Sequence, residues 1–374
     1  MIARFVGAVL TVWIGCVGGV AAQDATPLAQ AVNAAGARDW DTVREVRAEL
    51  SDPVSRDILD WMLMRGRQGS FSECVDFLDR NGDWPGLPLL RLRCEYSIPK
   101  IGAVPQRVLE FFAETIPQTG TGSLRLIEAL EAKGRTEEAK QEARRAWQVF
   151  NLAQIEHDAF VERHGEHLKD LHTVRLDMLL WRGEEKAAQR MFNLVPEAWA
   201  KLAIARLGLR GNEPGVDTMI EAVPASLAED AGVAYERFLW RARKGRTADA
   251  VEVLLERSLS VQDLGRPIEW ADRRRSLARE LMRDGNHAEA YAVASQHFLT
   301  AGSDYADLEW LSGFIALRKL NAPAQALAHF NSFQAAVETP ISLGRAGYWL
   351  GRAYEAEGQA DVAKAAYEFG ALYQ

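Results

Sequence analysis

Six segments of the chain repeat one short pattern, in which a residue that tolerates a positive backbone φ is followed five positions later by an alanine. Five of the turn residues are glycines and one is an asparagine. The six pairs are Gly134 and Ala139, Gly183 and Ala188, Gly245 and Ala250, Gly285 and Ala290, Asn321 and Ala326, and Gly358 and Ala363. Glycine and asparagine end helices cheaply, and a small residue early in the next helix lets two helices approach closely. The pattern therefore predicts six helix pairs that reverse at the turn residue.

Apolar residues after each alanine keep the spacing of one helix face, as in Ala326, Phe330 and Phe333. The turn residues are separated by 49, 62, 40, 36 and 37 positions, so only the last three intervals approach the period of about 34 that tetratricopeptide repeats have. We therefore predict an all-α fold, an α-superhelix (a solenoid or ring-like body) of degenerate tetratricopeptide-like helix pairs.

The chain before residue 120 has the same character with less regularity. We expect helices around residues 28–35, 41–50, 54–64, 72–80 and 87–96, with a strong turn at 81–86 and the most linker-like stretch at 117–122. No period-2 run of β-branched residues predicts a strand. The predicted organisation is one helical domain over residues 23–374, with irregular helices at 23–120 and helix-pair repeats at 121–374.

Residues 1–22 have the character of an export signal. Arg4 gives a basic start, residues 5–20 are uncharged and mostly apolar, and small residues precede a cleavage site near Ala22. A membrane anchor is an alternative, although the stretch is short for a span of about 20 residues, and lipid attachment at Cys16 is another. No later apolar run has the length of a membrane span. We expect a periplasmic protein with no membrane span after removal of the signal.

Cys74 and Cys94 remain after such processing. In an oxidising compartment they can form a disulfide if neighbouring helices bring them together, and otherwise they are two buried thiols. The sequence leaves both alternatives open.

Charge and composition exclude some functions. The net charge is −8 and the charges are interspersed, which argues against a nucleic-acid partner because phosphate recognition needs a basic face.

Four histidines cluster along the chain. Two of them at i and i+3 could bind a metal ion together, but no other residue has a recognisable spacing for a third metal ligand. The four histidines are His157, His164, His167 and His172. Sequence motifs of nucleophilic, phosphate-binding and dinucleotide-binding sites do not occur. We therefore predict no catalytic, cofactor-binding or metal-binding residue. The ten tryptophans after residue 22 are expected to pack between helices rather than stack on sugars.

Five strings resemble those of a known family. They are NGDWPGLPLLRLRCE at 81–95, RLDMLLWRGE at 175–184, AYERFLWRARKGR at 234–246, DYADLEWLSGFIALRKL at 304–320 and TPISLGRAGYWLGRAYEAEG at 339–358. Together they resemble the superhelical, U-shaped domain of soluble lytic murein transglycosylases. The resemblance implies a periplasmic protein associated with peptidoglycan glycan strands, in a family whose lysozyme-like C-terminal module cleaves those strands through a glutamate in a Glu-Ser motif.

The chain departs from that family at the catalytic module. No Glu-Ser pair occurs anywhere in the sequence, so no catalytic residue can be carried over, and we expect the catalytic domain to be absent and the chain alone to be inactive. Either the chain is shortened before the module, which we favour, or it is a natural scaffold. The alternative function is a stand-alone periplasmic helical-repeat scaffold that holds a protein partner on its concave face.

Overall fold

The computed structural model describes residues 27–373, which form two compact units divided between Leu168 and Lys169. The predicted signal at residues 1–22 lies outside the described residues. The described residues are helical and contain no strand. None of the helices in residues 27–373 has the length and apolar character needed to cross a membrane.

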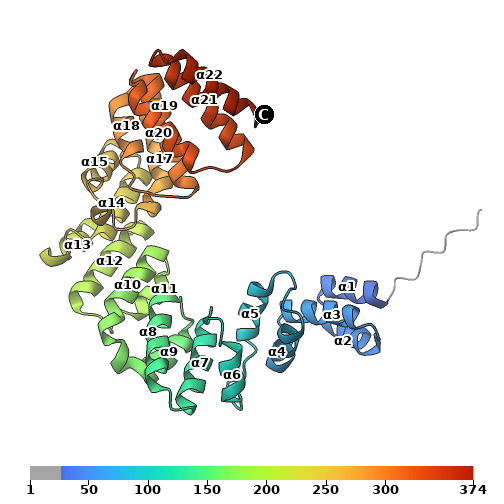
Figure 1. Cartoon of the computed structure of the whole chain (residues 1–374). Coiled ribbons are helices and arrows are strands. Elements are labelled where there is room, and N and C mark those ends of the chain that lie inside the picture. Colours follow the sequence, from blue (N-terminus) through green and yellow to red (C-terminus); the bar gives the residue numbers. More distant parts are fainter. Residues whose placement is uncertain (1–26, 374) are drawn as a thin grey trace, which may run out of the picture. The chain divides into compact units, whose positions relative to one another are not determined.

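Among the described residues, the first unit is a run of nine α-helices. They pack mainly on their neighbours along the chain (Figure 1). Their bounds are α1 (Pro27–Ala37), α2 (Trp40–Glu49), α3 (Pro53–Arg65), α4 (Phe71–Arg80), α5 (Leu87–Glu95), α6 (Pro105–Phe111), α7 (Gly120–Ala132), α8 (Thr136–Val149) and α9 (Gln154–Leu168). The five helices expected between residues 28 and 96 are all present, whereas the short helix α6 was not expected.

The second unit continues the same architecture. Its elements are η1 (Lys169–Leu171), α10 (His172–Arg182), α11 (Glu185–Arg190), α12 (Glu197–Gly211), α13 (Val216–Glu221), η2 (Ala225–Leu227), α14 (Ala231–Arg243), α15 (Thr247–Arg257), α16 (Val261–Leu264), α17 (Pro267–Arg283), α18 (His287–Ser295), α19 (Ser303–Lys319), α20 (Pro323–Ala335), α21 (Pro340–Ala356) and α22 (Ala360–Ala371). Figure 1 shows α17 to α22, coloured orange to red, as neighbouring rods.

The six repeated turns have nearly the same backbone geometry. Each turn residue has a positive φ: 73° at Gly134, 74° at Gly183, 72° at Gly245, 89° at Gly285, 48° at Asn321 and 74° at Gly358. At five of them the next N–H donates to the carbonyl five residues before it, and at Asn321 the span is six residues. This bonding satisfies carbonyls that a helix end leaves free. The second helix of each pair then starts two residues after the turn residue.

The six alanines lie where the two helices of each pair pack closely, as the sequence predicted. Each is at most 1% exposed, and its N–H bonds to the carbonyl of the residue just after the turn residue. The prediction of an all-α fold built from helix pairs is therefore confirmed.

Buried side chains form several separate cores along each unit. In the first unit one core joins α1 to α3 and another joins α3 to α7. In the second unit a large core around Phe238 and Trp270 joins α14 to α19, and smaller ones around Phe330 and Phe333 join α19 to α21. Each helix is therefore stabilised mainly by the helices next to it, as in other repeat architectures.

Two details differ from the sequence-based expectation. The stretch 117–122 is not an exposed linker, because Thr119, Gly120 and Gly122 are buried and α7 begins at Gly120. Gly165, a residue type that disfavours the interior of a helix, lies inside the continuous helix α9. At 117–122 a long-range packing partner outweighs the tendency of glycine to break a helix. At Gly165 the length of α9 outweighs the same tendency.

Candidate functional site

Cys74 on α4 and Cys94 on α5 are joined by a disulfide, with their Cα atoms 6.0 Å apart. Both side chains are at most 2% exposed and lie in the core that joins α3 to α7. The bond closes the hairpin that α4 and α5 form around the turn at 81–86. The disulfide therefore holds together α4 and α5, two helices that line a hollow of this unit.

The clustered histidines do not converge. His157 and His164 are buried on α9, where the His157 ring lies 5.2 Å from that of Trp147 and the His164 ring lies 6.3 Å from that of Phe160. His167 is exposed, and His172 begins α10 in the second unit. Burial lowers the pKa of His164. Within residues 27–373, no group of three histidine, cysteine or acidic residues is placed to hold a metal ion.

The ten tryptophans are all buried or half-buried among the described residues. Trp147 and Trp270 are fully enclosed, and the Trp270 indole N–H donates to the Leu264 carbonyl at 3.0 Å. Packing between helices is the environment of these two rings.

Two concave regions of the first unit lie on the two sides of α6. This helix has only seven residues, from Pro105 at its start to Phe111. A helix this short leaves space beside it. One hollow of about 360 Å³ opens toward α4 and α5, and one of about 700 Å³ opens toward α7 and α8.

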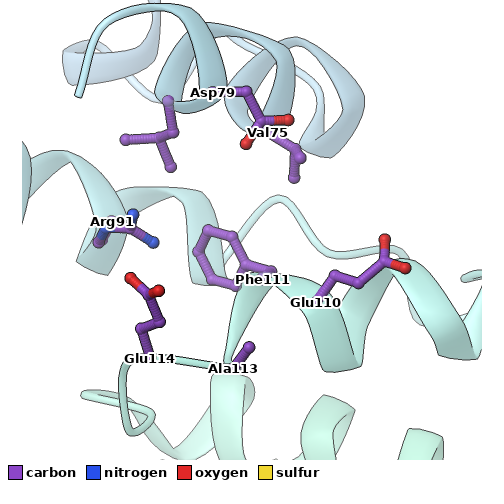
Figure 2. Close-up of a pocket in the computed structure, with 8 residues that line it drawn as sticks. Val75, Asp79, Arg91, Glu110, Phe111, Ala113 and Glu114 are labelled. Carbon is purple, nitrogen blue, oxygen red and sulfur yellow. The ribbon is translucent and has the colours of Figure 1, made fainter.

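The first hollow has an apolar base and an acidic edge (Figure 2). Phe111 forms part of the base, and its ring packs edge-on against Phe71 at 5.3 Å. The Arg91 guanidinium lies 5.9 Å from the Phe111 ring centre, and Figure 2 shows the Glu114 carboxylate turned toward it. Asp79 and Glu110 also line the hollow. The hollow is thus lined by three carboxylates and one guanidinium, so its charge is net negative and favours a basic group.

The second hollow has a more apolar floor, made by Leu109, Phe112, Leu126 and Leu130. Its rim carries charges that are already paired. The Arg135 and Glu138 side chains bond at 2.6 Å, and so do those of Arg145 and Glu142. An apolar floor inside a polar rim is the usual anatomy of a protein interface.

A buried carboxylate holds the segment between α6 and α7 in place. Glu95 is 1% exposed and accepts hydrogen bonds from the Gln118 N–H at 2.8 Å and from the Thr119 hydroxyl at 2.6 Å. Burial raises its pKa, against the opposing effect of these hydrogen bonds. A Cβ at position 122 would lie 2.2 Å from a Glu95 carboxylate oxygen, so only glycine fits there. This contact fixes the segment that joins α6 to α7.

A second buried network lies in the second unit. The Glu309 carboxylate bonds to His297 Nε2 at 3.0 Å and to His329 Nδ1 at 2.7 Å. The Leu299 N–H donates to His297 Nδ1, so His297 carries its proton on Nε2 and donates it to Glu309. The other His329 nitrogen meets the Tyr291 hydroxyl at 3.0 Å. Burial would raise the pKa of Glu309, but the two histidine hydrogen bonds outweigh it and lower the pKa to about 2.

Comparison with known proteins gives little beyond the architecture. No family model and no curated protein matches the chain. Among solved structures, a chain from the crystal structure of the APC/C hetero-tetramer Cut9-Hcn1 is similar over 93% of this chain and 86% of that chain, with 13% sequence identity and a TM-score of 0.28. The helical-repeat architecture therefore rests on the turns and helices of this chain itself.

Proposed function

We propose that this chain is a helical-repeat scaffold that binds a protein partner at the two hollows beside α6. The observation that carries the proposal is the interruption of a closely packed helical stack by a seven-residue helix with a hollow on each side. Helical repeats commonly use such surfaces to bind other proteins. The partner would place apolar side chains on Leu126 and its neighbours, and a lysine or arginine beside Asp79 and Glu114.

A charge on the apolar floor tests this function. Leu126→Arg should weaken binding of a purified stoichiometric partner at least about tenfold, because the guanidinium would be desolvated without a counter-charge. Val54→Arg is the matched control, since Val54 is an exposed residue of α3 in the same unit. Titration calorimetry measures both. Equal affinity of Leu126→Arg and the unchanged chain would refute this docking surface.

The second candidate function is that of a peptidoglycan-associated body similar to the superhelical domain of a lytic transglycosylase. It is supported by the five family-like strings, four of which coincide with the first helix of a pair or of the α21–α22 hairpin: α10, α14, α19 and α21. Under this proposal glycan strands bind the chain, which has no glutamate in a Glu-Ser motif with which to cleave them.

Incubation with murein sacculi separates the two candidates. Retention on sacculi without a protein partner would favour the peptidoglycan body, and a stoichiometric protein partner without retention would favour the scaffold. Release of 1,6-anhydromuropeptides by the purified chain would contradict the inactivity that we propose for it.

Export to the periplasm is part of both proposals. It is supported by the basic and apolar character of residues 1–22 and by the buried Cys74–Cys94 disulfide, a bond typical of oxidising compartments. N-terminal sequencing of the protein from its native host should begin near Gln23. A chain that retains Met1 in the cytoplasmic fraction would contradict export.

A further inference from the structure

A groove in the second unit differs from the α6 hollows in both charge and lining. It has a volume of about 290 Å³ and lies among α12, α13, α14 and the start of α15. Leu209, Val216 and Ile220 give it one apolar wall. Trp240, two arginines of α14 and the arginine just before α15 give it a cationic wall. We call it the Trp240 groove.

The three arginines are not equally satisfied. Arg246 bonds to the Asp249 carboxylate, with its Nε at 2.6 Å, and Arg241 bonds to the Asp249 carbonyl at 2.8 Å. Arg241 also lies 3.6 Å from Glu252. By contrast, no carboxylate or carbonyl among the described residues lies within bonding distance of the half-buried Arg237. One guanidinium in this wall therefore lacks an acceptor.

The electrostatic environment of Arg237 agrees with this deficit. Burial lowers its pKa, and the neighbouring charges of Arg241 and Arg257 lower it further, while Glu256 and Asp217 only partly oppose them. An added carboxylate would relieve both the desolvation and the repulsion between like charges.

Trp240 adds a second unused donor to the same wall. Its indole N–H is shielded from water and donates to no acceptor in the described chain. Its ring lies 5.8 Å from the Lys244 ammonium and 5.9 Å from the Arg246 guanidinium. A rigid aromatic ring next to arginines is the composition of an interface hot spot.

We propose that the Trp240 groove binds an acidic side chain of a protein partner, with the carboxylate at Arg237 and an adjacent apolar side chain on Val216 and Ile220. The Asp217 and Glu221 carboxylates on α13 line the same groove. They repel a dense anion such as phosphate or nucleic acid, and they restrict a single carboxylate to the arginine side. The site is separate from the α6 hollows, so it stands or falls independently of them.

The test first selects peptides that bind the purified full chain from a displayed random library. A selected peptide is then synthesised with an acetylated N-terminus and an amidated C-terminus, and its affinity is measured. We expect selected peptides to share an aspartate or glutamate beside an aliphatic or aromatic residue. Changing that acid to its amide in the peptide should weaken binding about tenfold or more, because a charged hydrogen-bonded pair is lost.

Variants of the chain locate the interaction. Arg237→Gln should weaken binding as much as the peptide change does, and the two changes together should be no worse than either alone. Arg237→Lys should recover part of the affinity, since it restores the charge but not the planar fork. Arg318→Gln is the control, because Arg318 is exposed on α19 outside the groove.

Several results would overturn the proposal. One is a failure to select any acidic peptide, and another is selection of the same peptides by Arg237→Gln. Additive losses in the double change would show that the acid binds elsewhere. Binding that disappears on amidation of the peptide terminus would assign the groove to a terminal carboxylate instead of an acidic side chain. Unfolding curves of each variant establish that it is folded.

Discussion

Gly134 and Gly165 both have open space where a Cβ would stand, yet their backbones differ. Gly134 has a φ of 73° in a turn, whereas Gly165 lies inside α9. We expect Gly134→Ala to destabilise the chain by about 1–2 kcal/mol, since the left-handed conformation opposes a Cβ, and Gly165→Ala to stabilise it by about 0.4–1 kcal/mol. Urea unfolding of both variants measures the difference. Changes of the same sign would contradict this account of the turns.

Ala250 tests the other half of the repeated pattern. It is fully buried against the core that joins α14 to α19, so Ala250→Leu should destabilise the second unit by about 1–3 kcal/mol through overpacking. The control is Ala248→Leu on the exposed side of the same helix, which should change stability by less than about 0.5 kcal/mol. Thermal unfolding of the two variants compares them, and equal shifts would show that α15 does not require a small residue there.

At the scale of helices, the sequence predicted the longer helices and the repeated turns better than it predicted the connection between α5 and α7. The helices at 28–96 and the six repeated turns were predicted because local signals, namely caps, glycines and apolar spacing, determine them. Helix α6 was missed because seven residues give too few turns for a periodic pattern. The linker expected at 117–122 was wrong because Glu95, which is 23 residues from its partner Gln118, binds and buries that stretch.

Glu309 shows how one side chain ties together α19, α20 and the segment after α18. Its pKa of about 2 is below that of the unfolded chain, so the unfolded state takes up the proton first as pH falls. The stability that it contributes is present above pH 4.5 and is lost as pH falls toward 2. The sequence could not predict this network, because its members are 12 and 20 residues apart and share no motif.

Replacement of Glu309 should therefore change the acid response. Glu309→Gln should be less stable than the unchanged chain at pH 7 by up to ~3 kcal/mol, and should lose less stability between pH 4.5 and 3. Urea unfolding at each pH measures this. The exposed Glu357→Gln is the control. A variant with the same pH dependence as the unchanged chain would show that Glu309 does not govern acid stability.

At the scale of the whole molecule, separate cores imply that damage stays local. Replacing Cys74 and Cys94 together by alanine should lower the stability of the first unit by about 2–4 kcal/mol, because the disulfide constrains its unfolded state. Hydrogen exchange should then accelerate in α3 to α5 and stay unchanged in α17 to α22. Uniform acceleration along the chain would show instead that the helices unfold as one cooperative body.

The binding surfaces were less predictable than the scaffold that carries them. The family-like strings and the turn pattern concern helices and their joints, whereas the α6 hollows arise from a missing length of helix. Arg237 has no sequence signal at all, because many arginines lie on these helices and only the structure shows that Arg241 and Arg246 bond to Asp249 whereas Arg237 does not.

The bond between Cys74 and Cys94 also has a mechanical meaning. A protein pulled from its two ends releases contour length as each hairpin gives way, but the bonded cysteines bridge a sequence separation of 20 residues. The loop between them would extend by about 3.3–3.6 Å per residue, so the bond removes roughly 60–66 Å of extension after the 6.0 Å that the bonded Cα atoms still span is subtracted. In a force–extension experiment the fully stretched oxidised molecule should be shorter than the reduced one by that length. A chemical reductant would therefore increase the maximum extension of the chain.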